Sequence, residues 1–337
     1  MSYNKNSGYG QALLNMVSSQ IPTFGRIFIV MNSSNTDEEN YNRMQEVFPP
    51  DPLGQVRFFT SLSDAYDATE SNNNDVILLD ANSSHSLTTG LAVTKSRVHF
   101  IGMDGGNRLV QQGTKVELAT AGTTAYVLKD TGTRNTYTNI KFIQSGTAVT
   151  CLHVAELGGE GSVFKNTSFT FGVADNLDLT TATEVVTGTD SATYINCQFG
   201  QDTLVSSATA RSIMVIDQVT SGQEFKSNIF KDCTWLGASS DADLQCITIS
   251  AVGDILFTNH LIRPSFIASI SGGAGTIEGT KAVSTPNGTT NGTILISYPM
   301  CHGFANLGIN GTNNDSLYVA GPVLTAVDHV GVQPVAT

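Results

Sequence analysis

The chain has 337 residues, of which 17 are basic and 29 are acidic, so its formal net charge is −12. A chain with so few lysines and arginines cannot neutralise phosphates over a large surface, and direct binding to nucleic acid or to an anionic membrane is not expected. Hydrophobic residues make up 40% of the chain and charged residues only 14%. This composition favours many short strands and turns over charged amphipathic helices.

Residues 1–23 are predicted to form an N-terminal arm. A short helix is expected over Gln11–Gln20, ending before Pro22, and its apolar side consists of Leu13, Leu14 and Val17. Two interpretations stay open: this side packs on the body of its own chain, or it attaches the chain to a neighbouring subunit. The apolar run is too short for a signal peptide, and no run in the chain approaches the length of a membrane span.

Residues 24–75 are predicted to form a small α/β segment. The expected elements are a strand over 26–31, a helix over 36–48, a strand over 56–60 and a short helix over 61–68. The acidic residues that follow Thr36 are typical of the first turn of a helix. A further buried strand is expected over Asp75–Leu79, where five residues in succession include four that are apolar.

One six-residue motif then occurs five times. It consists of an aromatic residue, any residue, Asn or Asp, two residues of any type and a large apolar residue. The copies start at Tyr137, Phe164, Tyr194, Phe230 and Phe257, so that successive copies are 27, 30, 36 and 27 residues apart. A repeat of this length with variable insertions indicates a solenoid, in which the insertions form loops.

Each position of the motif has a structural interpretation. Asn and Asp tolerate the left-handed backbone region, so the third position is expected at equivalent corners, occupied by Asn139, Asn166, Asn196, Asp232 and Asn259. Side chains alternate sides after the corner. The fifth position is mostly polar and is expected to face outward. The sixth position is expected to form a core ladder of Phe142, Phe169, Phe199, Trp235 and Ile262.

This pattern resembles the right-handed parallel β-helix of pectate-lyase-like proteins, over about residues 56–310. The segment from Leu62 to Leu79 resembles the entry of those proteins, in which a short helix caps the open core. The expected fold is therefore all-β, a parallel β-helix over 76–310 with the small N-terminal α/β cap and with a C-terminal cap and tail over 311–337. An ordinary β-sandwich is the alternative, and the step from polar to apolar at positions five and six argues against it, although the last copy breaks this step.

The resemblance also implies what an active site would need. Pectate-lyase-type enzymes need carboxylates on neighbouring coils for calcium and a basic proton acceptor, and polygalacturonase-like enzymes need paired acids. The second and fifth positions of the motif, which are expected to face outward, contain no carboxylate. The remaining acidic candidates are interpreted as turn or solvated residues: Asp175, Asp178, Asp202, Asp217 and Glu224. No catalytic, cofactor or metal site is therefore predicted.

Cysteine and histidine give no metal-site pattern either. The five cysteines are odd in number and lack a CxxC pair, and Cys197 and Cys233 share the fourth position of the motif. Reduced, buried thiols and assembly in a reducing cytoplasm are expected. His260 shares that position in the fifth copy and is expected to be a hydrogen-bonded core residue.

Three segments resemble sequences of tailed bacteriophages: Phe24–Val30, Asn74–Leu79 and His99–Met103. The chain resembles virion proteins of such phages, which implies a non-enzymatic structural role. The expected role is a capsid-decorating (cement) protein attached through its terminal segments. It is expected to form a homo-oligomer, a trimer, with the major capsid protein or other virion proteins as partners, and to be located in the virion after assembly in the host cytoplasm. The alternative is a tail fibre or tailspike that binds or cleaves polysaccharide on the host surface.

Overall fold

The computed structural model describes the chain from the first strand to the last coil, with gaps. The described residues are 25–31, 42, 46, 50, 54–81, 84–104, 113–179, 181–208, 211–217, 219, 225–240, 244–249, 257–270, 279–284, 292–306 and 317–320. The arm with Leu13, Leu14 and Val17 and the C-terminal tail lie outside these residues. So does nearly all of the expected helix over 36–48, of which residues 42 and 46 are described as helical.

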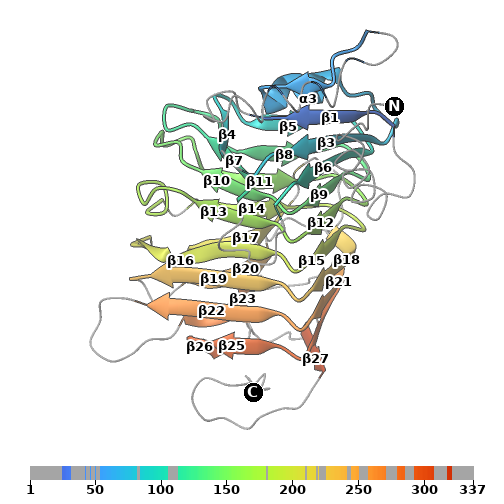
Figure 1. Ribbon diagram of the computed structural model, residues 1–337. Coiled ribbons are helices and arrows are strands. Elements are labelled where there is room, and N and C mark those ends of the chain that lie inside the picture. The colour runs from blue at the N-terminus through green and yellow to red at the C-terminus, as the bar shows by residue number, and fades with distance from the viewer. Residues whose placement is uncertain are drawn as a thin grey trace.

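Three parallel sheets run side by side along the molecule, and the chain visits them in turn (Figure 1). Sheet A contains, in spatial order, β2 (Phe58–Phe59), β1 (Ile27–Val30), β3 (Asp75–Leu79), β6 (Val98–Gly102), β9 (Thr136–Thr138), β12 (Val163–Lys165), β15 (Thr193–Ile195), β18 (Phe225–Lys231), β21 (Phe257–Ile262), β24 (Gly292–Ser297) and β27 (Leu317–Ala320).

Sheet B contains β4 (Ser84–Leu87), β7 (Lys115–Leu118), β10 (Lys141–Gln144), β13 (Ser168–Phe171), β16 (Gln198–Ser206), β19 (Thr234–Ser239), β22 (Ser265–Ile270) and β25 (Met300–His302). Sheet C contains β5 (Leu91–Val93), β8 (Leu128–Asp130), β11 (His153–Leu157), β14 (Thr183–Thr187), β17 (Ser212–Ile216), β20 (Gln245–Ile249), β23 (Gly279–Ser284) and β26 (Phe304–Asn306). From β3 onward, each strand pairs in parallel with the strand that follows one full coil later.

Left-handed corners lie on both sides of sheet A in four successive coils. At the corner between sheets A and B, Asn139, Asn166, Asn196 and Asp232 have φ values from 50° to 58°. At the corner between sheets C and A, the left-handed residues are Arg97, Arg134, Gly161, Ser191 and Ser227. In these four coils the two corners are five residues apart, as from Arg134 to Asn139. The length variation between coils therefore falls outside sheet A.

The interior contains two stacked aromatic ladders. One runs through Phe100, Tyr137, Phe164, Tyr194 and Phe230, with successive ring centroids 4.4–5.0 Å apart and nearly parallel rings. The other runs through Phe142, Phe169, Phe199, Trp235 and Phe266, with spacings of 5.1–5.6 Å. The ladders meet edge to face, for example at Phe164 and Phe169, 6.1 Å apart. Such ring pairs contribute about 0.5–1.5 kcal/mol each beyond the buried area.

The predicted register of the fifth motif copy is wrong. Asn259 aligns with Asn228, which lies four residues before the corner residue Asp232, and Ile262 aligns with Lys231 on the outer face of sheet A. Arg263, with φ 50°, occupies the corner, and Phe266 takes the core position that aligns with Trp235. A bulge between Lys226 and Asn228 lengthens β18, so the match of Phe257, Asn259 and Ile262 to the motif is coincidental.

An arginine at the corner is stabilised by a charge on the coil before it. The Arg263 Nε and a terminal nitrogen of its guanidinium contact the two carboxylate oxygens of Asp232, at 2.7 and 2.9 Å. This bidentate ion pair takes the place of the amide hydrogen bonds made by the asparagines of the earlier coils. The residue type at the corner therefore changes from asparagine or aspartate to arginine, while the left-handed backbone conformation stays the same.

Helix α3 (Leu62–Ala68) closes the N-terminal end of the core, as the sequence predicts. Ser61 caps the helix, and Leu62, Ala65 and Tyr66 are buried on its inner side. The Tyr66 ring stacks on Phe100 with 6.2 Å between centroids. The ammonium group of Lys95 donates to three backbone carbonyls at or near the end of the helix, at 2.8–2.9 Å. The second strand of this segment is shorter than predicted, since β2 covers only two residues.

The corrected register gives a direct stability test. Phe266→Ala is expected to lower the free energy of unfolding by about 3–5 kcal/mol because it opens a cavity in the fully buried second ladder. Ile262→Ala is expected to cost about 1 kcal/mol or less, because the side chain lies on the outer face. Urea unfolding followed by circular dichroism measures both. Equal losses, or a larger loss for Ile262→Ala, would contradict the register.

Candidate functional site

The corner asparagines of three successive coils bind one another. The Asn166 side-chain amide donates to the Asn139 side-chain oxygen at 2.9 Å, and the Asn196 amide donates to the Asn166 oxygen at 2.8 Å. The Asn166 side chain, in the middle of the three, thus forms hydrogen bonds with both of its neighbours. The predicted corner residues 139, 166, 196 and 232 form a structural element, and their polar groups are largely occupied within it.

The column of outward residues at the start of the sheet B strands is polar. Lys141 aligns with Lys115 on one side and Ser168 on the other, and Glu117 lies two residues beyond Lys115 on the same face. Ser168 and Gln198 at the start of the next two strands are buried, although they point away from the interior by alternation. Desolvation lowers the pKa of the Lys141 ammonium, and the nearby Lys115 lowers it further. Lys141 is thus a basic group on this face that releases its proton more readily than a free lysine.

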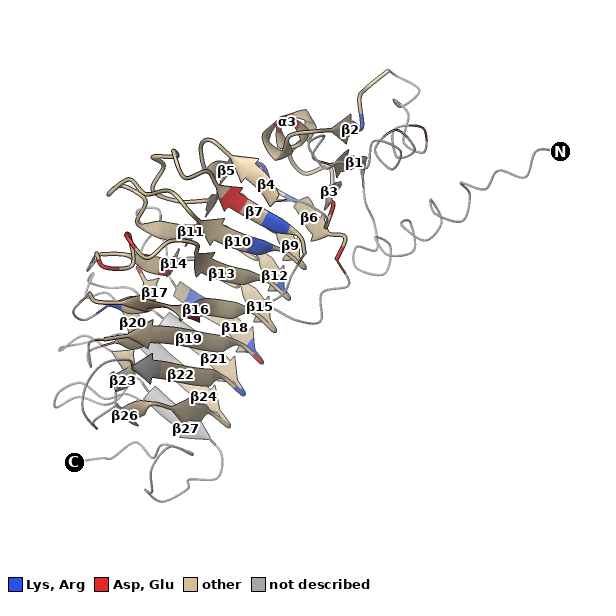
Figure 2. Ribbon diagram, turned by 60° about the vertical axis from the view of Figure 1, so that its left-hand side comes forward, with Lys and Arg blue, Asp and Glu red and all other residues tan. Residues whose placement is uncertain are grey.

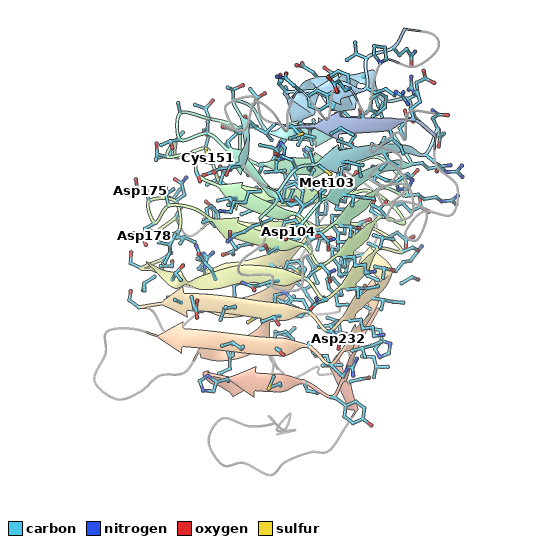
Figure 3. The ribbon with its side chains drawn as sticks, in the orientation of Figure 1. Met103, Asp104, Cys151, Asp175, Asp178 and Asp232 are labelled. Atoms are coloured by element: carbon cyan, nitrogen blue, oxygen red, sulfur yellow. The ribbon has the colours of Figure 1, made fainter. Side chains whose placement is uncertain are left out.

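The acidic candidates lie on separate segments, with Asp202 inside β16 and Asp217 directly after β17. Asp175 and Asp178 lie in the turn after β13, and Figure 3 shows both at the edge of the coil, away from Asp104 and Asp232. One carboxylate oxygen of Asp178 accepts a hydrogen bond from the Ser207 backbone N–H at 2.6 Å, which ties this side chain to the next coil. Glu224 lies outside the described residues. Within the described ranges, no group of three or more His, Cys, Asp or Glu side chains is placed to hold a metal ion.

Asp130 is a buried carboxyl group in the interior that the sequence analysis missed. One of its oxygens accepts from the Asn135 amide at 2.9 Å and from the Gly132 N–H at 3.2 Å, and the other accepts from the Ser162 hydroxyl at 2.9 Å. Burial raises the pKa of Asp130 to about 7, although these hydrogen bonds oppose the shift. Alternation along Leu128–Asp130 puts residue 130 inside, which is the signal that could have found it.

A buried ion pair was also missed. Glu184 of β14 and Arg211, just before β17, are both almost fully buried, and the guanidinium donates to one Glu184 oxygen. Burial raises the pKa of Glu184, while the charge of Arg211 opposes this shift. The guanidinium carbon lies 5.9 Å from the centre of the Phe171 ring. The two residues are a full coil apart in the sequence, so no local pattern indicates the pair.

The cysteines are free and buried, as expected for structural thiols. Cys197 and Cys233 lie on adjacent coils, and their thiols donate to the carbonyls of Phe164 and Tyr194 at 3.4 and 3.5 Å. Burial raises the pKa of Cys233 and raises that of Cys301 to about 12. Such thiols stay protonated at neutral pH and are poor nucleophiles.

His260 is placed differently from its prediction. The corrected register aligns it with Ile229 and Leu295 on the outer face of sheet A, where its ring Nε2 lies 3.0 Å from the Ser297 hydroxyl oxygen. It is a half-buried surface residue and not a core residue, because the register of β21 differs by four residues from the alignment that the motif predicts.

Comparison with solved structures shows the same coil in other proteins. Pectin methylesterase PemA from Erwinia chrysanthemi is 12% identical with a TM-score of 0.50, and the match covers 92% of this chain and 94% of that chain. Pectate lyase Pel9A is 16% identical with a TM-score of 0.53, and the match covers 88% of this chain and 68% of that chain. The chain is a right-handed parallel β-helix. At these identities the similarity shows the fold alone.

Other comparisons add little. A structure described as Geobacillus virus E2 ORF18 is 10% identical with a TM-score of 0.39 over 73% of this chain and 54% of that chain, and this low similarity carries no argument. No protein-family model matches the chain, and no curated protein matches it. Among the described helices, none has the length and apolar character needed to cross a membrane.

The Asp130 carboxyl group is expected to make stability depend on pH. Its pKa of about 7 in the fold lies above the ordinary value of 3.8, so the fold keeps the proton where the unfolded chain has lost it. The stability that the proton contributes is therefore complete below about pH 4 and is lost as the pH rises through about 7, by up to about 4 kcal/mol. Urea unfolding from pH 4 to 8 should show the wild type losing this increment relative to Asp130→Asn.

The matched control for this measurement is Asp67→Asn, on the exposed side of helix α3, which should leave the pH dependence of the wild type unchanged. The difference in the free energy of unfolding between the wild type and Asp130→Asn is the quantity to compare. If this difference does not change with pH, or if it favours the wild type more as the pH rises, the assignment is contradicted.

Proposed function

We propose that this chain is a non-enzymatic structural protein of a bacteriophage virion, a capsid-decorating (cement) protein attached through its terminal segments. The observation that carries the proposal is the chemistry of the β-helix wall. In the first four motif copies the second position holds Thr138, Lys165, Ile195 and Lys231, and the fifth holds Lys141, Ser168, Gln198 and Thr234. These aligned columns form the outer faces of sheets A and B beside the corner, and they contain no carboxylate.

Several charged groups on the wall are engaged with one another. Asp232 pairs with Arg263, Glu156 with Lys129 at 2.7 Å and Asp190 with Lys226 at 3.8 Å. Glycoside hydrolysis requires two carboxyl groups that converge on one bond. Carboxylates that are paired with cations across coils, or held in a turn as Asp178 is, do not form such a pair. The described wall is suited to contact with other proteins more than to catalysis.

Attachment to the particle is proposed to occur through the two terminal segments. Residues 1–23, with Leu13, Leu14 and Val17, and the tail beyond residue 325 are short and weakly apolar in sequence, and we propose that these segments make the contacts with the particle. Several such arms in one homo-oligomer, which we propose to be a trimer, bind with avidity to the major capsid protein or to another virion protein. The net charge of −12 keeps free copies soluble until assembly in the host cytoplasm.

The experiment is a mass-spectrometric inventory of purified virions. The chain should be present on wild-type particles, and its occupancy should fall by about ten-fold or more when residues 2–20 are deleted. A full-length variant with Leu13, Leu14 and Val17 changed to Ser separates loss of apolar contact from loss of length, and circular dichroism controls for folding. Absence of the wild-type chain from the particle would overturn the virion proposal, and full occupancy of the deletion variant would overturn attachment by the arm.

A second candidate function is supported by Lys141. A tail fibre or tailspike that binds or cleaves host-surface polysaccharide would need a proton acceptor on the wall, and the lowered pKa of Lys141 suits that role. The two enzymes of known structure reported above act from this same fold. The test is turnover of bacterial surface polysaccharide by the purified chain. Activity that is lost in Lys141→Met, Asp175→Asn or Asp202→Asn but kept in Lys165→Met would favour this candidate over the first.

A further inference from the structure

Two sides of the β-helix carry exposed apolar side chains beside charges of opposite sign. The first side is the outer face of sheet A, called here the sheet A face and defined by Lys165, Ile195, Ile229, Lys231 and Leu295. Since Phe164, Tyr194 and Phe230 point into the core, the residues on either side of them point outward. Lys165, Ile195 and Lys231 align on three successive coils, which makes one column of this face.

The apolar residues of the sheet A face lie in the neighbouring column. Ile229 is 40% exposed and Leu295 is 37% exposed, and the register aligns both with His260 between them. Lys165 and Lys231 are exposed. Although the whole chain is strongly acidic, this face therefore presents two exposed ammonium groups beside two exposed apolar side chains, Ile229 and Leu295.

The second side is the edge between sheets B and C, called here the B–C edge and defined by Val149, Asp175, Asp202 and Val205. Val149 and Asp175 lie on the segments that follow β10 and β13, and Asp202 and Val205 lie in the carboxyl-terminal half of the adjacent strand β16. Val149 is 74% exposed and Val205 is 39% exposed, and both carboxylates are exposed. Figure 2 shows acidic segments in the loops beyond β13 and basic segments at the far ends of β12 and β18.

We propose that the B–C edge of one copy of this chain binds the sheet A face of a second copy. The occupant is argued from complementarity: each side carries exposed apolar residues, and the two lysines of one face the two carboxylates of the other. Because the two sides lie on different parts of the same rod, they cannot meet within one chain. A contact between two sheet A faces would bring lysine against lysine, so the heterologous contact is the favoured one.

A heterologous contact repeats from copy to copy and closes into a ring where its rotation permits. It therefore gives the homo-oligomer of the proposed function a lateral interface along the rod, in addition to attachment through the terminal arms. The inference rests on the proposed function only for its setting, because self-association of the purified chain is measurable without a virion.

The test is a charge swap read by analytical ultracentrifugation of the full chain. Lys165→Glu with Lys231→Glu should weaken self-association by about ten-fold or more, and so should Asp175→Lys with Asp202→Lys. The four changes combined restore opposite charges across the contact and leave the net charge of the chain unchanged. The combined variant is expected to associate within about three-fold of the wild type, and wild-type association should weaken with added salt.

The control is Asp64→Lys with Asp67→Lys on the exposed side of helix α3, which adds the same charge as the B–C edge variant but lies outside both sides. This control should associate like the wild type. A wild-type chain that stays monomeric at about 100 µM would overturn the proposal, and so would normal association of the B–C edge variant or no restoration in the combined variant. None of these outcomes affects the virion inventory, so the two proposals fail separately.

Discussion

The left-handed corner on each side of sheet A is the constraint on which the rest of the structure depends. A spacing of five residues between the two corners, as from Ser191 to Asn196, gives four successive coils the same length of chain across sheet A. Because side chains alternate with a period of two, equal strands put ring over ring inside and aligned columns outside. The stacked aromatics, the asparagine ladder and the outer columns of sheets A and B all follow from this alignment. An extra residue between the corners would turn the ladder residues outward, whereas the loops of the other edges vary in length.

The corner between sheets A and B can be predicted from the sequence because four successive coils have Asn or Asp there. Asn and Asp adopt the left-handed region readily, and an aromatic residue two positions earlier marks the core, so four copies and the fold class follow. The fifth copy fails because Arg263 replaces the asparagine and is stabilised by Asp232, a partner that lies a coil earlier. The second corner has no such signature, since arginine, glycine and serine share it. Contacts between coils, such as Glu184 with Arg211, depend on loop lengths and cannot be identified before the register is known.

The fold is shared with a pectin methylesterase and a pectate lyase, but a shared backbone fold does not determine which side chains lie on its outer surface. Here the described carboxylates are dispersed: Asp130 lies inside, Asp178 is held by a neighbouring turn, and Asp232 is engaged by an arginine. Exposed apolar side chains instead lie beside lysines on one side and beside carboxylates on another. A long rod with such sides is suited to repeated contacts with its own copies and with a larger particle. The stacked interior keeps the coils of that rod in register, and the outer columns carry the side chains on which the proposed contacts depend.

The most direct measurement of this account is a cryo-electron microscopy map of the purified virion at a resolution that shows coils about 4.8 Å apart. The account predicts β-helix rods on the particle surface, with the outer face of sheet A of one rod against the loop that follows β13 and the carboxyl-terminal half of β16 of its neighbour. Rods that stand apart with solvent on both of these sides would contradict the lateral contact. A map of a particle that contains the protein by mass but shows its sheet B face open toward bound polysaccharide would contradict the structural role itself.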